Sequence, residues 1–150
     1  MPIEPTESAV PQPLLLDTHV LVWFMSGDRG RLGPLAVEQV ERAIEGQRCL
    51  VSVISVWEIA MLTSRGRLHL SGSVDAWIMR ARQPPGVRIA ELSPEAVIES
   101  TRLPASFHPD PADRMLVATA RTIGGILVTV DRRILSYAAA GHVRAMDASA

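Results

Sequence analysis

Lysine is absent from this 150-residue chain, and all fifteen of its basic side chains are arginine. The absence excludes phosphoaspartate receivers and haloacid-dehalogenase-type phosphotransferases, because both classes rely on a lysine beside a cluster of acids. Arginine suits bidentate contacts to phosphate, although we attribute the bias to genomic composition. The net charge of −1 gives no global positive field of the kind that attracts nucleic acid.

Cysteine is nearly absent as well. The single Cys49 excludes a disulfide within the chain and fits a reducing cytoplasm, where we expect the protein. Its neighbours Leu50 and Val51 indicate a buried, structural thiol. No apolar run approaches the length of a membrane span, and the N-terminus lacks the pattern of a signal peptide. We therefore expect a soluble protein.

The length of the chain predicts one domain. Residues 1–13 carry four prolines among polar residues, which predicts a flexible tail. Residues 14–150 are predicted to form the domain. Short apolar runs alternate there with helical patterns, and this alternation indicates a three-layer α/β fold, in which helices cover both faces of a mainly parallel sheet.

The predicted strands are short apolar runs, as expected when both faces of a sheet are covered. They span residues 14–16, 49–53, 87–92, 126–128 and 143–146. The predicted helices span residues 18–25, 34–45, 55–65, 74–82, 94–101, 111–123 and 132–137. Right-handed crossovers between parallel strands place every strand-to-helix junction at the same edge of the sheet.

Four acids stand near these junctions. Asp17 follows the first strand, and Asp131 follows the fourth. Glu58 is predicted in the first turn of the helix after the second strand. Asp113 is predicted in the first turn of the helix that precedes the fourth strand. Ligands bind at this edge of open α/β sheets, so the four carboxylates are candidates for a common site.

Helix capping explains each acid when it is considered alone. Asp17 and Asp131 fit N-cap positions, and Asp113 lies where negative charge stabilises a helix. Glu58 fits a capping box that begins at Ser55. Four carboxylates in one crevice, however, repel each other by about 4 kcal/mol per close pair. Such a cluster stays protonated or binds cations, and oxygen ligands suit Mg²⁺ or Mn²⁺, ions that can activate water and stabilise the departing oxygen of a phosphodiester.

The segments around these acids resemble the successive motifs of PIN-domain nucleases, and most closely the VapC-type toxins of bacterial toxin–antitoxin pairs. The segments are LLLDTHVLVW at 14–23, VSVISVWEIA at 51–60, DPADRMLVATA at 110–120 and ILVTVD at 126–131. One departure is that relatives often carry a lysine soon after the WEIA motif, where this chain has Leu62 or Thr63. Arg65 or Arg67 could replace that lysine in a contact with RNA phosphate or with a partner.

The resemblance implies a PIN-like sheet of four or five mainly parallel strands. It also implies an endoribonuclease selective for single strands, a homodimer, and inhibition by a small VapB-like antitoxin. The catalytic acids and ligands of Mg²⁺ or Mn²⁺ would be Asp17, Glu58, Asp113 and Asp131, with Asp131 binding directly or through water. No side chain needs to act as a nucleophile in this chemistry.

Four further residues are candidates for supporting the site or touching substrate. Thr129 lies on the same side of its strand as Asp131 and could orient a carboxylate or a metal-bound water, although ordinary β-propensity explains it equally well. Thr18 and Ser55 could contact the metal shell or substrate, but capping is the favoured interpretation. Arg114 could reach a phosphate, but an internally paired or solvated arginine is favoured.

Two alternatives to a toxin remain open. The first is a housekeeping or DNA-directed PIN nuclease without an antitoxin. The second is a non-catalytic module that holds a partner's arginine in its acidic pocket, although retention of all four acids argues against it. The four histidines show no metal-ligand spacing. Trp23, Trp57 and Trp77 are interpreted as core or interface residues.

Overall fold

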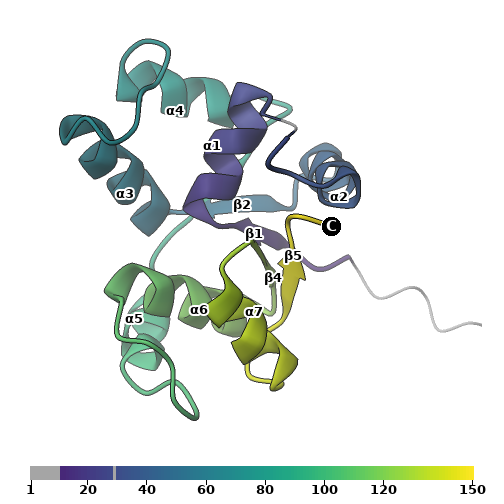
Figure 1. The fold of residues 1–150 in the computed structure, drawn as a ribbon, viewed down its shortest axis with the longest axis vertical. Helices are drawn as coiled ribbons and strands as arrows, with labels where there is room; N and C mark the ends of the chain where they lie inside the picture. Colours follow the sequence, from purple (N-terminus) through teal and green to yellow (C-terminus); the bar gives the residue numbers. More distant parts are fainter. Residues whose placement is uncertain (1–10, 29) are drawn as a thin grey trace, which may run out of the picture.

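The computed structural model describes residues 11–28 and 30–150, so the predicted tail over residues 1–13 lies mostly outside the described residues. Five parallel strands form one sheet in the order β3-β2-β1-β4-β5 (Figure 1). They are β1 (Leu14–Leu16), β2 (Cys49–Ser52), β3 (Arg88–Ala90), β4 (Ile126–Thr129) and β5 (Ala145–Asp147). The parallel sheet confirms the α/β class.

Seven helices occur in the described ranges and cover both faces of the sheet. Helices α1, α2, α3 and α4 lie on one side, and α5, α6 and α7 on the other (Figure 1). Their bounds are α1 (Thr18–Ser26), α2 (Pro34–Glu45), α3 (Val53–Ser64), α4 (Val74–Arg82), α5 (Pro94–Ser100), α6 (Pro111–Ile123) and α7 (Arg132–Ala139). The predicted three layers are therefore present.

Strand β1 is the central strand and explains the two cores. It pairs with β2 on one side and β4 on the other. Successive side chains of a strand point to opposite faces, so Leu14 and Leu16 join the core under α1–α4, while Leu15 joins the core under α5–α7. All three leucines are buried, as the continuous apolar run predicts.

The strand order reverses between β1 and β4. The chain builds β1, β2 and β3 outward in one direction, then returns to place β4 and β5 on the other side of β1. Crevices at such a reversal, beyond the carboxyl ends of the strands, are the usual ligand sites of open α/β sheets. Asp17 directly follows β1, and Thr129 is the last residue of β4.

Helix α6 begins and ends where its sequence predicts. Asp110 is the N-cap and accepts a hydrogen bond from the N–H of Asp113 at 3.1 Å. Pro111 occupies the first turn, where its missing N–H costs nothing. Gly124 ends the helix with a φ of 65°, a left-handed conformation that favours glycine.

The boundary between β2 and α3 differs from the prediction. Helix α3 begins at Val53, two residues before the predicted start at Ser55, because Ser52 caps it by accepting from the N–H of Ile54 at 3.1 Å. The proposed capping box of Ser55 and Glu58 is therefore wrong, and Glu58 lies in the second turn of α3.

Other boundaries move by a few residues. Strand β3 is shorter than predicted, α7 continues to Ala139, and β5 begins at Ala145 rather than at Val143. Cys49 is fully buried, and burial raises the pKa of its thiol to about 12, which agrees with a structural role. No helix in the described part of the chain is long and apolar enough to span a membrane.

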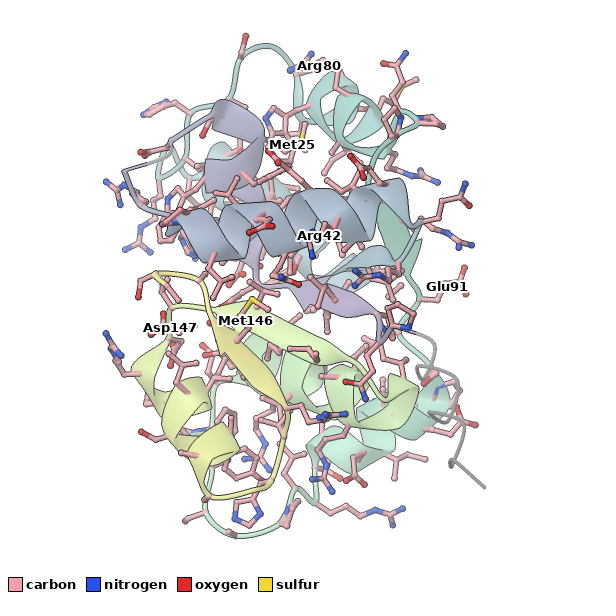
Figure 2. All side chains as sticks on the ribbon, turned by 90° about the vertical axis from the view of Figure 1, so that its right-hand side faces the viewer. Met25, Arg42, Arg80, Glu91, Met146 and Asp147 are labelled. Carbon is pink, nitrogen blue, oxygen red and sulfur yellow. The ribbon has the colours of Figure 1, made fainter. Side chains whose placement is uncertain are left out.

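Helix α2 separates its apolar and charged faces (Figure 2). Val40 and Ala43 are buried. Arg42 lies on the outer face of the helix and pairs with Glu38 one turn earlier at 2.8 Å. Met146 of β5 extends to the same core as the buried face of α2, so the edge strand is tied to the α1–α4 layer.

Candidate functional site

Asp17 joins the two strands at the point of reversal. It is the N-cap of α1, and its Oδ1 accepts from the N–H of Thr18 at 2.8 Å. Its Oδ2 accepts from the hydroxyl of Thr129 at 2.6 Å. Its backbone N–H donates to the carbonyl of Val128 at 2.9 Å. The carboxylate is therefore held in one position by groups from both β1–α1 and β4.

Thr129 and Asp131 form the other half of this junction. The Thr129 hydroxyl accepts from the N–H of Asp131 at 3.0 Å while it donates to Asp17. Asp131 caps α7, since its Oδ1 accepts from the N–H groups of Arg133 at 2.8 Å and Ile134 at 3.2 Å. Thr129 thus orients a carboxylate, which was one of its two predicted roles.

Asp113, in the first turn of α6, is surrounded by negative charge. Burial first, and then the negative charge of four other acids, together raise the pKa of its carboxyl to about 7. These acids are Asp17, Asp110, Asp131 and Glu58. The structure therefore brings the four predicted acids close enough to act on one another electrostatically, with Asp110 as a fifth neighbour.

The pKa of Asp17 is raised as well. Burial is the main cause, and the negative charge of Glu58 adds to it. The hydrogen bonds from Thr129 and from the N–H of Thr18 oppose the shift but do not outweigh burial. Glu58 therefore reaches Asp17 from the second turn of α3, so the error in the start of that helix does not remove Glu58 from the cluster.

The chemistry of these donors fits a hard divalent cation. Oxygen ligands are what Mg²⁺ and Mn²⁺ prefer. Among the residues that the structure describes, however, no three His, Cys, Asp or Glu side chains stand in the arrangement of a formed metal site. The oxygens of Asp17 and Asp131 are directed to hydrogen-bond donors, and each carboxylate oxygen keeps a second lone pair for an ion.

Thr18 and Ser55 do not cap helices, which corrects the favoured interpretation of both. Thr18 is the first residue of α1, and its hydroxyl donates to the hydroxyl of Ser55 at 2.9 Å. Both residues are buried. This bond ties α1 to α3 and so fixes the relative position of the helices that carry Asp17 and Glu58.

Arg114 is paired internally. Its guanidinium donates to the carbonyls of Ser100 at 2.8 Å, Phe107 at 3.0 Å and His108 at 3.3 Å. These bonds hold the loop before α6 against the helix. The favoured prediction for Arg114 agrees with this arrangement, and a phosphate contact would require these bonds to break.

His108 is a further neighbour of the site. The sequence predicted no histidine as a metal ligand. Nε2 of His108 lies 3.2 Å from Oδ2 of Asp113 but makes no hydrogen bond to any described group. Burial lowers the pKa of its imidazole, and the positive charge of Arg133 lowers it further. The only signal in the sequence was its position two residues before the Asp110 cap.

Comparison with known proteins gives the family. A model of the PIN domain matches residues 14–140. The chain belongs to the PIN-domain family. Over 124 residues this PIN domain is 37% identical to Ribonuclease VapC22 of Mycobacterium tuberculosis, a match that covers 83% of the chain and 91% of that protein.

Solved structures share the fold at low sequence identity. VapBC2 of Rickettsia felis, bound to a promoter DNA fragment, has a TM-score of 0.64 and 13% identity over 89% of this PIN domain and 96% of that chain. DNA-bound VapBC of Salmonella typhimurium has a TM-score of 0.64 and 16% identity over 91% of this PIN domain and 98% of that chain. FitAcB of Neisseria gonorrhoeae has a TM-score of 0.62 and 21% identity over 89% of this PIN domain and 96% of that chain. These likenesses confirm the predicted PIN-like fold.

Proposed function

We propose that this PIN domain is a metal-dependent endoribonuclease and the toxin of a toxin–antitoxin pair. The observation that carries the proposal is the raised pKa of Asp113, caused in part by Asp17, Glu58 and Asp131. The shift indicates that acids from distant parts of the chain lie close enough to Asp113 for their charges to act on it, near the reversal of strand order. The match to a VapC ribonuclease supports RNA as the substrate.

Asp17, Glu58 and Asp113 would form the main metal-binding set, with Asp131 completing it directly or through water. A bound Mg²⁺ or Mn²⁺ would activate water and neutralise charge on the departing oxygen. Thr129 keeps the carboxylate of Asp17 in place for this role. Hydrolysis of this kind leaves 5′-phosphate and 3′-hydroxyl ends.

The electrostatics explain why a cation would bind here. Without one, burial and the negative charges around Asp113 raise its pKa to about 7 and so favour its protonated form below that pH. A divalent cation replaces that proton and removes the repulsion among the acids. The cluster is therefore costly as a structural feature and useful as a cation site.

Cleavage of single-stranded RNA by the purified protein tests the proposal. We expect cleavage with Mg²⁺ or Mn²⁺, and its loss with a chelator. Asp113→Asn should lower kcat/KM by at least about a thousandfold, since a ligand and its charge are lost. Asp110→Asn is the matched control, because asparagine also caps helices, and it should retain activity within about threefold. Undiminished cleavage by metal-free Asp113→Asn would contradict the assignment.

The partners follow from the same family. We propose a VapB-like antitoxin, since the structural neighbours include VapBC complexes, and a homodimer in a cytoplasmic setting. Growth arrest on expression, relieved by co-expression of a short adjacent gene, would support the toxin assignment. A chain that cleaves RNA without arresting growth would instead be a housekeeping nuclease.

A further inference from the structure

A groove of about 480 Å³ lies beside the acids, between the loop before α6 and helix α7. This volume is within the range of small-molecule sites. We call it the ring groove, because four aromatic or imidazole rings line it together with two arginines. The ring-bearing residues are Phe107, His108, Tyr137 and His142, and the arginines are Arg132 and Arg133.

The four rings make a continuous row. The ring centroids of Phe107 and His108 are 4.4 Å apart, those of Phe107 and Tyr137 are 4.7 Å apart, and those of Tyr137 and His142 are 4.8 Å apart. The Tyr137 hydroxyl donates to the carbonyl of Pro104, which fixes the ring. The groove thus has the only tyrosine of the chain and one of its two phenylalanines in its lining.

Positive charge borders the row of rings. Arg132 and Arg133 open α7 directly after Asp131, and their side chains are 82% and 66% exposed. Their contacts are loose, at 3.6 Å from Arg132 to Asp147 and 3.9 Å from Arg133 to Asp131. Exposed pairs of this kind contribute little energy, so both guanidinium groups are available to a phosphate.

The ring groove is next to the proposed metal site, since two of its lining residues contact the acids. His108 lines the groove, and its Nε2 is 3.2 Å from Oδ2 of Asp113. Arg133 lines it as well, and its backbone N–H is bound by Asp131. A chain whose phosphate lies at the acids would therefore place its neighbouring nucleotide in the groove.

We propose that the ring groove binds the nucleotide next to the cleaved phosphodiester of single-stranded RNA. This inference rests on the proposed function. The base would stack on the half-buried rings of Phe107 and His142, which the buried Tyr137 supports from behind. The flanking phosphate would contact Arg133. Stacking on aromatic side chains needs an unpaired base, since a duplex hides the base faces. The groove thereby explains a preference for single strands, which the acids alone do not supply.

Filling the groove tests this site by kinetics. Ser136 lines the groove from the exposed surface of α7, so Ser136→Trp should occupy the space of a base without disturbing the core. Ala139→Trp is the matched control on the same helix, because Ala139 is also exposed but lines a different hollow. With a 12-nucleotide single-stranded RNA that the wild type cleaves at a mapped bond, we expect Ser136→Trp to raise KM about tenfold and Ala139→Trp less than twofold.

The substrate provides the second half of the test. For the wild type, kcat/KM should be about tenfold lower with an RNA that lacks the base on one side of the cleaved bond than with the intact RNA. For Ser136→Trp, kcat/KM should be the same with the two RNAs. Independent losses, or equal effects of the two tryptophans, would overturn the inference while leaving the nuclease intact. Absence of cleavage by the wild type would instead overturn the proposed function.

Photo-cross-linking tests the groove even if no cleavage occurs. A mixed-sequence single-stranded RNA carrying 4-thiouridine, bound to Asp113→Asn, should cross-link chiefly to peptides containing Phe107, Tyr137 or His142. When Ser136→Trp is combined with Asp113→Asn in the same protein, these products should fall at least fivefold. The combination of Ala139→Trp with Asp113→Asn should leave them unchanged. Cross-links that avoid these peptides, or that resist Ser136→Trp, would show that the groove serves another ligand, such as a peptide of the antitoxin.

Discussion

The junctions β1–α1 and β4–α7 have the same local design and different surroundings. In each, a short and mostly apolar strand is followed within two residues by an aspartate that caps the next helix. Asp17 is half-buried and uses both carboxylate oxygens, whereas Asp131 uses only Oδ1, for two N–H groups of α7, and keeps 26% of its side chain exposed. Burial raises the pKa of Asp17.

The position of each strand in the sheet explains the difference. Strand β1 is central, so Asp17 is enclosed by elements on both sides and receives the hydroxyl of Thr129. Strand β4 lies between β1 and β5, a three-residue edge strand, and Asp131 keeps 26% of its side chain exposed to solvent. A cap and a functional acid are therefore compatible roles, and the tertiary neighbours decide how much of each role a residue has.

Replacing each aspartate by asparagine tests this contrast most strongly. Asp17→Asn should lower kcat/KM for single-stranded RNA by about a thousandfold or more, equivalent to about 4 kcal/mol. Asp131→Asn should lower it by only ten- to a hundredfold, because we place Asp131 as the residue that completes the metal site directly or through water, outside the main set of Asp17, Glu58 and Asp113. Steady-state cleavage at saturating Mn²⁺, with circular dichroism to check folding, measures both. Equal losses in kcat/KM for the two variants would contradict the proposed difference between the two junctions.

The charge on Asp113 should make the metal-free protein less stable as the pH rises. Its pKa is raised to about 7 in the folded state from 3.8, so the folded state binds the proton more tightly. The stability from this group is greatest below pH 4 and is lost as the pH rises toward 7. Asp113→Asn should therefore be more stable than the wild type by about 2 kcal/mol at pH 8, and the difference should vanish near pH 4.

Urea denaturation with a chelator present measures this effect. Asp75→Asn is a suitable control, since Asp75 is an exposed acid in the first turn of α4 and lies outside the acidic cluster. Its substitution should change the unfolding free energy by less than about 0.5 kcal/mol at either pH. A pH-independent difference for Asp113→Asn would show that the pKa of Asp113 is not raised in the folded state.

Thr129 links the two junctions, so its removal should affect both. Thr129→Val loses the bonds to Asp17 and to the N–H of Asp131, and we expect kcat to fall about tenfold, or about 1.4 kcal/mol. Thr129→Ser keeps the hydroxyl and should restore most of the activity. If serine and valine were equally impaired, the methyl group rather than the hydroxyl would be responsible.

The smallest expected effect separates capping from chemistry at Asp131. Asp131→Ala should lower the free energy of unfolding by about 1 kcal/mol, because the N–H groups of Arg133 and Ile134 lose their acceptor. Asp131→Asn should keep the cap and most of this stability. Thermal denaturation of the two variants at one pH measures the difference, and identical midpoints would contradict a capping role.

The elements that the sequence predicts well are those with strong local signals. The leucine run of β1 and the Asp110–Gly124 limits of α6 need no tertiary information. The start of α3 is different. Val53 and Ile54 have the β-branched side chains of a strand, and only the bond from the N–H of Ile54 to Ser52 decides for a helix.

The residues of the candidate site also differ in how well the sequence predicts them. The four acids could be named from their positions at strand ends and helix starts, and the resemblance to a known family supported them. The contacts of His108 and Phe107 beside these acids could not be predicted. His108 reaches Asp113 through a loop without regular structure, and Phe107 meets Tyr137 across about thirty residues of chain. No local pattern predicts contacts of that kind.

The hydrogen bond between Asp17 and Thr129 joins residues that are 112 positions apart. The first acid of the cluster is therefore among the first parts of the domain to leave the ribosome, and its partner is among the last. No partial chain that ends before Thr129 can assemble the crevice, whatever helices it has already formed. Translation itself thus delays the assembly of the proposed catalytic centre until most of the polypeptide has been made.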